Sequence, residues 1–225
     1  MNWEDEGFVI GKRRFRENAI ILDIFTGKFG KTSGIVYGGT SRKVKNHLQL
    51  MNKIFIIHTS KSENKIGYFK TELIKPISPK YFDNKNKILC LNSLSSILKS
   101  TLPENQSHKK IYDSLCFLLD NFSKENWMNL YLNWEVQLIQ NLGFGFNLDK
   151  TDTQKNFNEN TISINVDNVL YKMPKFLISK NEEKLDNNDI YNGLSFVRNL
   201  LENKFFNPNN LRFPYSRKLL EKKFI

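Results

Sequence analysis

The sequence predicts an α+β protein, with a small five-stranded β-barrel at the N-terminal end and a mostly α-helical region after it. Two observations lead to this class. Five short runs rich in β-branched residues, separated by glycine-marked turns, occupy roughly the first 75 residues. After Pro76 and Pro79, apolar residues recur instead at spacings of three and four, which is the helical period. We therefore expect two domains, residues 1–78 and 79–225.

The barrel prediction rests on strand-length runs and the turns between them. The basic segment 13–18 separates the first two runs, and the turn signal 27–30 separates the second from the third. Gly38 and Gly39 then interrupt the pattern and lead into a polar, basic loop over residues 40–46, and a hairpin turn is expected at 62–65. A barrel of the oligonucleotide-binding (OB) type is the commonest architecture of this kind that also carries a basic face. The expected strands are Glu6–Lys12, Ala19–Thr26, Lys31–Tyr37, Lys53–Ser60 and Ile66–Ile74.

The helical region follows from the periodicity of its apolar residues. The strongest predicted helix has Ser123 as its N-cap and Gly143 as its C′ residue. Residues 149–160 are polar and predict a loop, and Thr161–Ser179 alternates weakly, which predicts an irregular hairpin within an insert near 150–180. The expected helices are Asn84–Ser100, His108–Phe122, Trp127–Leu142, Asn188–Asn203 and Phe213–Phe224.

Several classes of protein are not expected from this sequence. Its first ten residues include three acidic ones and no apolar h-region, and the chain has no run of about 18 apolar residues, so we expect neither a secretory signal nor a membrane partner. Cys90 and Cys116 fall in different predicted helices, and we expect reduced thiols in a cytoplasmic protein. No phosphate-binding loop, nucleophile elbow or HExxH motif is present, and His58 is interpreted as a structural residue, so we expect no catalytic site.

Basic residues are concentrated near the N-terminus. Residues 7–45 contain nine basic and two acidic side chains, in a chain whose formal net charge is +11. Lys and Arg neutralise phosphates, and aromatic rings stack on unpaired bases, so we expect nucleic acid to bind here with little sequence preference. The candidate phosphate-binding residues are Lys12, Arg13, Arg14, Arg16, Lys28, Lys31, Arg42, Lys43 and Lys45, and the candidate stacking residues are Phe15, Phe29 and Tyr37.

Both features of the basic segment leave an alternative open. The lysines of this Asn- and Lys-rich chain could serve only for solubility, and the three aromatic rings could face the barrel core. The aromatic stripe within Trp127–Leu142 is also ambiguous: it indicates core packing first, and an apolar groove for a partner peptide second. The candidate rim of such a groove is Lys109, Lys110, Arg198 and Arg217.

Four pieces of the sequence stand in a specific order. They are the opening pattern WxDEGFVIGKRRFxExxxILxIFTxxxGK over residues 3–31, the Gly-Gly-x-x-Arg loop at 38–42, the strand KIFII at 53–57, and the helix end LGFG at 142–145. Together they are similar to the RecO family of bacterial DNA repair proteins, and the resemblance covers essentially the whole chain.

The resemblance implies an N-terminal OB-fold, binding of single- and double-stranded DNA, and annealing of complementary strands at the nucleoid. It also implies a RecR-like partner in loading RecA onto strands coated by the single-stranded DNA-binding protein. The acidic tail of that coating protein docks on the helical region in some members. Many members carry a four-cysteine zinc site after the LGFG helix end, but residues 149–156 contain no Cys, so no zinc and no other cofactor are expected.

Two other functions stay open from the sequence. One is an RNA-binding or ribosome-associated OB-fold protein, which preferential binding of RNA over DNA of one sequence would favour. The other is a protein adaptor that works through the helical region, with the charge of the barrel incidental. Capture of an acidic, Phe-ended peptide after removal of the N-terminal arginines would favour the adaptor.

Overall fold

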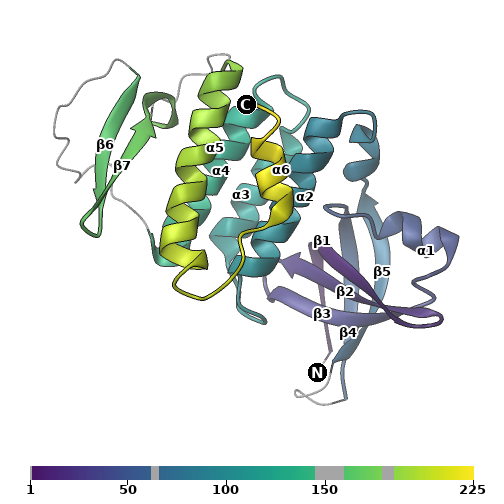
Figure 1. Ribbon diagram of the computed structural model, residues 1–225. Coiled ribbons are helices and arrows are strands. Elements are labelled where there is room, and N and C mark those ends of the chain that lie inside the picture. The colour runs from purple at the N-terminus through teal and green to yellow at the C-terminus, as the bar shows by residue number, and fades with distance from the viewer. Residues whose placement is uncertain (1, 62–65, 145–159, 179–184) are drawn as a thin grey trace. The chain divides into compact units, whose positions relative to one another are not determined.

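The computed structural model describes residues 2–61, 66–144, 160–178 and 185–225 (Figure 1). The chain divides into two compact units, Met1–Tyr112 with Pro214–Leu220, and Asp113–Phe213 with Glu221–Ile225. The predicted turn at 62–65 and nearly all of the polar segment 149–160 lie outside the described residues.

The first unit contains a closed five-stranded barrel. The strands are β1 (Asn2–Arg16), β2 (Ala19–Thr26), β3 (Gly30–Tyr37), β4 (Lys53–Thr59) and β5 (Gly67–Lys75), in the order β1-β2-β3-β5-β4. All neighbours are antiparallel except β3 and β5, whose parallel pairing closes the barrel through Gly34–Gly67 and Ile35–Tyr68. The predicted OB barrel and its five strands are confirmed.

The barrel is held together by the apolar side chains that point into its interior. Every second residue of β2, for example Ile20, Leu22 and Ile24, lies inside, where it meets β-branched and aromatic residues of the other strands. The buried members of this core are Val9, Ile20, Leu22, Ile24, Val36, Leu48, Ile54, Ile56 and Phe69. Because the side-chain period of a strand is two, the intervening residues point outward and are available for other contacts.

Two local predictions were wrong. The first strand extends from Asn2 to Arg16, because its early residues pair with β4 and its basic end pairs with β2. Those basic positions lack the apolar alternation that marks a half-buried strand, so the sequence signal ended early. The predicted loop at 40–46 contains a short helix, α1 (Arg42–His47), capped by the Ser41 side chain, which accepts from the Val44 amide. Six residues are too few to show a helical period.

Helices complete the first unit. A 3₁₀ turn, η1 (Ser78–Tyr81), leads to α2 (Lys85–Thr101), which is capped by Asn84 and packs on β1, where the Ser95 hydroxyl donates to the Ile10 carbonyl at 2.5 Å. The first turn of α3 (Lys109–Asp120) also belongs here. The Tyr112 hydroxyl donates to the Glu6 carbonyl at 3.2 Å. Most of α6 (Tyr215–Glu221) completes the unit.

The second unit is built on α4 (Trp127–Ile139) and α5 (Asn187–Leu201), which pack on each other. Strands β6 (Thr161–Val166) and β7 (Val169–Pro174) form the predicted hairpin. Its two-residue turn has positive φ at both positions, as a type I′ turn requires. The remaining short elements are η2 (Gln140–Phe144), η3 (Lys175–Leu177) and η4 (Glu202–Phe206).

The ends of α4 test two predicted boundary residues. Gly143 has φ 87° after the last helical turn, which confirms it as the residue that ends the helix. The predicted N-cap Ser123 was wrong, since the helix begins after Asn126. Tyr131, Trp134 and Leu138 of the aromatic stripe are buried, and this burial supports core packing over a peptide groove.

Candidate nucleic-acid interface

The basic end of β1 forms a two-stranded ribbon with β2. Lys12 pairs with Leu22 and Arg14 with Ile20, and both partners point into the barrel core. Arg13 pairs with Ile21, on the opposite side of the ribbon. The predicted cluster is therefore divided between two sides: Lys12 and Arg14 lie on the inner side, at the mouth of the barrel. Arg13 lies on the outer face.

The inner side of the ribbon meets α1. The Lys12 ammonium donates to the Leu48 carbonyl at 2.8 Å. Burial, and then the nearby charge of Lys45, lower the pKa of Lys12. Two positive charges, Lys12 and Lys45, thus lie near each other, and no carboxylate is among the causes that shift the pKa of Lys12. We call Lys12, Arg14, Arg42, Lys43 and Lys45 the mouth group.

The tip of the ribbon is tied to the loop that precedes α1. The Gly38 amide donates to the Asn18 carbonyl at 2.8 Å, and the Thr40 hydroxyl lies 3.4 Å from the Glu17 carbonyl. Figure 1 shows the ribbon reaching out beside α1. These contacts bring cations that lie about thirty positions apart in the sequence to one end of the barrel, where a chain of phosphates would meet several of them.

The outer face of the ribbon carries a buried carboxylate. Asp23, whose side chain is 4% exposed, forms ion pairs with Arg13 at 3.1 Å and with Lys99 of α2 at 2.8 Å. The Ser33 hydroxyl donates to it at 2.8 Å. Burial by itself would raise the pKa of Asp23, but the hydrogen bonds from Lys99 and Ser33 and the charges of Lys99 and Arg13 outweigh it, so the pKa lies below its usual value.

Replacing Asp23 with Asn is expected to lower the free energy of unfolding at pH 7 by about 1–3 kcal/mol, because charge-assisted hydrogen bonds are lost. A depressed native pKa stabilises the fold above the unfolded pKa, about 3.9, and this stabilisation disappears as the pH falls through the native value. Urea denaturation of both proteins between pH 7 and pH 3 should therefore show the difference shrinking below about pH 4. The exposed Asp83→Asn variant is the control, and a difference that stays constant with pH would contradict the prediction.

Two of the candidate stacking residues are exposed, and a third is not free. Phe15 is 41% exposed and has the Arg16 guanidinium 5.2 Å from its ring centroid. Tyr37 is 60% exposed and stacks on Tyr68 of β5, which was missed in the sequence. One ring face of Phe29 is covered by Trp3 at 4.2 Å between centroids, so at most the other face is available to a base. Tyr68 points outward from β5, a strand in which buried and more exposed residues alternate. That alternation could have predicted its exposure from the sequence.

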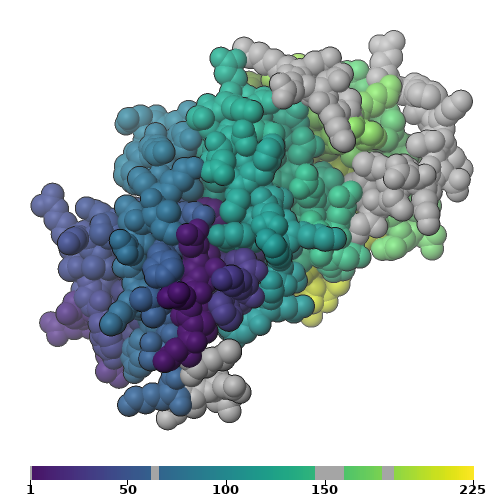
Figure 2. All heavy atoms as spheres, turned by 180° about the vertical axis from the view of Figure 1, so that it is seen from behind, coloured from purple at the N-terminus to yellow at the C-terminus, as the bar shows by residue number. Residues whose placement is uncertain are grey.

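Lys31 and Lys28 lie away from the mouth group and contact other parts of the first unit. The Lys31 ammonium donates to the Lys99 carbonyl at 2.9 Å, and burial, the largest cause, lowers its pKa. Lys28 lines a groove of about 460 Å³ at the other end of β1. The N-terminal end of that strand reaches the surface seen in Figure 2.

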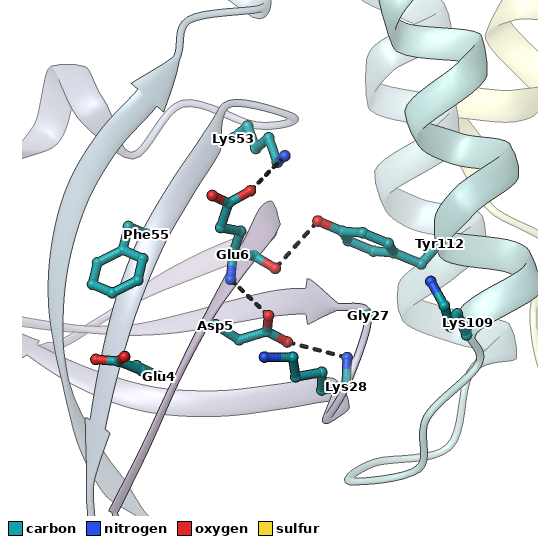
Figure 3. A pocket seen from close by; sticks show the side chains of 9 residues that line it. All are labelled: Glu4, Asp5, Glu6, Gly27, Lys28, Lys53, Phe55, Lys109 and Tyr112. Atoms are coloured by element: carbon teal, nitrogen blue, oxygen red, sulfur yellow. Dashed lines mark hydrogen bonds and ion pairs between the residues drawn. The ribbon is translucent and has the colours of Figure 1, made fainter.

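This groove, shown in Figure 3, mixes charges. Glu6 pairs with Lys53 at 2.6 Å, and Asp5 accepts from the Lys28 amide at 3.1 Å. Because carboxylates alternate with lysines, the groove is poorly suited to a polyanion. The lining residues are Glu4, Asp5, Glu6, Gly27, Lys28, Lys53, Phe55, Lys109 and Tyr112.

The proposed rim of a peptide groove does not form one set. Arg217 is fully buried, so the prediction that it lies on an exposed rim was wrong. Arg198 pairs with Glu221 at 3.0 Å and with Glu202 at 3.2 Å. Lys109 lines the mixed groove, and Lys110 is exposed on α3. A short C-terminal helix gives no sequence sign of which single side chain will be buried.

Among the described residues, no three His, Cys, Asp or Glu side chains come together as metal ligands would. The segment 149–156, which carried the prediction about zinc, lies outside them. In the same part of the chain, every helix is too short or too polar to cross a bilayer.

Comparison with known proteins gives two family matches that follow each other along the chain. Residues 1–77 match the family described as "Recombination protein O N terminal", and residues 84–218 match "Recombination protein O C terminal".

Individual relatives agree with these matches. The DNA repair protein RecO of Hyphomonas neptunium is 30% identical over 241 residues, which cover 99% of this chain and 98% of that protein. RecO of Ehrlichia chaffeensis is 34% identical over 162 residues, and RecO of Roseobacter denitrificans is 33% identical over 150 residues. These two alignments cover 71% and 66% of this chain but only 65% and 62% of the respective relatives. An asparaginyl-tRNA synthetase of Entamoeba histolytica superposes with a TM-score of 0.30 at 11% identity, which carries no argument.

Proposed function

This chain belongs to the RecO family of DNA repair proteins, and from that premise we propose that it binds single- and double-stranded DNA and anneals complementary strands without catalysing a covalent step. The single observation that supports this most is the mouth group. Five cations of the ribbon and α1 gather at one end of an OB barrel, and the structure shows no ion pair for them among the described residues.

The charge distribution favours phosphate contacts over base readout. The Lys and Arg side chains of the mouth group are exposed, as suits contact with a backbone that is the same at every nucleotide. Annealing needs this tolerance, because any pair of complementary strands must be accepted. The proposed protein therefore holds strands through their phosphates and leaves their base edges free to pair.

The proposed function includes partners. We propose that the protein acts in the cytoplasm at the nucleoid, with a RecR-like partner, in loading RecA onto strands coated by the single-stranded DNA-binding protein. The acidic tail of the coating protein is proposed to bind the helical region. Lys110 is exposed and lies outside the mixed groove that Lys109 lines, so it is the first residue of the suggested rim to vary in a tail-binding measurement.

A strand-annealing assay tests the proposal. Two complementary strands, one carrying a donor dye and the other an acceptor, are mixed with and without the protein, first bare and then coated by the single-stranded DNA-binding protein. We expect faster pairing in both cases, and a loss of the acceleration at high salt because phosphate contacts are screened. Non-complementary strands are the control. Unchanged pairing rates, or a clear preference for RNA in a competition with DNA of the same sequence, would contradict the proposal.

A further inference from the structure

We propose that Tyr37 and Tyr68, with Arg16 beside them, form a binding site for an unpaired base and its phosphate. This inference rests on the proposed function and deepens it, because it names the part of the ligand that the outer face of the barrel contacts. The mouth group lies on the inner side of the ribbon and on α1, whereas Tyr37 and Tyr68 point outward from the barrel, so the two surfaces are distinct.

The strand register brings the three residues into one row. Arg16 of β1 pairs with Ala19 of β2, and Ala19 pairs with Tyr37 of β3. Tyr37 stacks on Tyr68 of β5, with ring centroids 5.4 Å apart and planes inclined by 18°. Paired residues of neighbouring strands point to the same side, so Arg16, Ala19 and Tyr37 share the outer face. The alanine methyl between the two longer side chains is small, and leaves them room to approach.

The two tyrosines form a prearranged platform. The two rings are stacked, and the neighbouring Tyr68 side chain is the largest cause that raises the pKa of Tyr37. Tyr37 is 60% exposed and Tyr68 40%, which leaves ring surface open to solvent. A platform held in place before binding loses less conformational entropy when a flat ligand stacks on it.

The charge beside the platform identifies the ligand. Arg16 lies close enough to Tyr37 to lower its pKa, against the larger effects of Tyr68 and burial, and no carboxylate is among the causes. Arg16 also contacts Phe15 at 5.2 Å. Aromatic rings next to a guanidinium fit a nucleotide, which offers a π face and a phosphate together.

The ligand must be an unpaired strand. In a duplex each base already stacks on its neighbours, and its face is closed to a protein ring, whereas a single strand exposes its bases. OB-folds commonly bind oligonucleotides on the face of strands 2 and 3 and on the β1–β2 and β4–β5 loops; Tyr37 lies on β3, and Arg16 ends β1 at the first of these loops. The site should therefore add affinity for single strands alone, while the mouth group contributes to both forms through phosphates.

The test compares a strand with bases to a strand without them. The full chain and its Tyr37→Ala/Tyr68→Ala variant are titrated with an oligothymidylate of about 16 nucleotides and with an abasic strand of equal length. We expect the variant to bind the thymidylate about 5-fold to 150-fold more weakly. Binding of the abasic strand should be unchanged, because it offers phosphates but no base to stack.

Controls separate stacking from folding. Tyr37→Phe/Tyr68→Phe keeps both rings and should bind the thymidylate nearly as the unmodified protein does. Tyr37→Ala alone, at the more exposed ring, serves if the double variant is unstable. Tyr215→Ala removes a tyrosine that is 71% exposed on α6 and should change nothing.

The outcomes are distinguishable. Equal weakening for both strands, or unchanged thymidylate binding by the alanine variants, would overturn the stacking site and leave the proposed DNA binding intact. Unchanged binding of both strands with loss of capture of a protein partner would assign this face to protein docking, and would also overturn the inference. If the unmodified protein bound neither strand in a salt-dependent way, the proposed function itself would fail.

Discussion

Replacing Arg14, Arg16, Arg42, Lys43 and Lys45 together with Ala is expected to weaken binding of single-stranded DNA by up to about 10³-fold at about 0.1 M salt. Each phosphate contact releases condensed counterions and contributes about 0.7 to the slope of log affinity against log salt, so the slope should become less steep by up to about 3.5. Arg13 is left in place, because its guanidinium is already held by Asp23.

The measurement is a titration by fluorescence anisotropy at several salt concentrations. The matched control replaces Lys80, Lys85, Lys172, Lys222 and Lys223, all exposed and outside the barrel strands and α1, and removes the same five charges. If total charge alone determines binding, the two variants will lose equal affinity. If the position of the charges matters, only the variant in the barrel and α1 should lose most of its affinity for single-stranded DNA. An equal loss in both variants would mean that the barrel is not part of the interface.

A Gly30→Ala variant is expected to lose about 2–5 kcal/mol of unfolding free energy, enough to abolish much of the stability of a domain of this size. Gly30 has φ 69°, which costs a residue with a Cβ about 1–2 kcal/mol. An added Cβ would also lie 1.8 Å from the Gln106 carbonyl oxygen, a backbone atom that has no other rotamer to adopt. Overpacking of this kind typically costs a further 1–3 kcal/mol, roughly.

The control for this effect is Gly38→Ala. Gly38 has nearly the same φ, 68°, but an added Cβ has nothing within 4 Å. The difference between the two variants in urea denaturation therefore isolates the collision with residue 106 from the backbone strain. Equal losses would mean that the segment around Gln106 moves aside at little cost, contrary to the prediction.

Local pattern was sufficient for most of the fold. Five strands and five helices were predicted near their observed positions, because a half-buried strand or helix must repeat its apolar residues at a fixed period. Where burial does not impose that period, the pattern failed. The end of β1 is exposed and basic, and α1 has only six residues, so neither was recognised from the sequence.

The candidate site was recovered only in part. The concentration of charge in residues 7–45 was visible because composition needs no structure. The sequence did not show which of these charged side chains are already engaged by other parts of the protein. Arg13 pairs with Asp23, ten positions away, which also pairs with Lys99 of α2, and one ring face of Phe29 is covered by Trp3. These contacts depend on register and on distant chain segments, which residue type alone does not encode.

By itself, the sequence determined that a β-barrel precedes helices, that residues 7–45 are strongly basic, and that the chain resembles one family. Those properties follow from periodicity, composition and the order of motifs, each of which is local along the chain. Only the tertiary structure decided that the ribbon divides its cations between two sides, that Tyr68 joins Tyr37, and that Arg217 is buried. The reason is that strand register and long-range packing bring side chains together from positions whose separation carries no signal in the sequence.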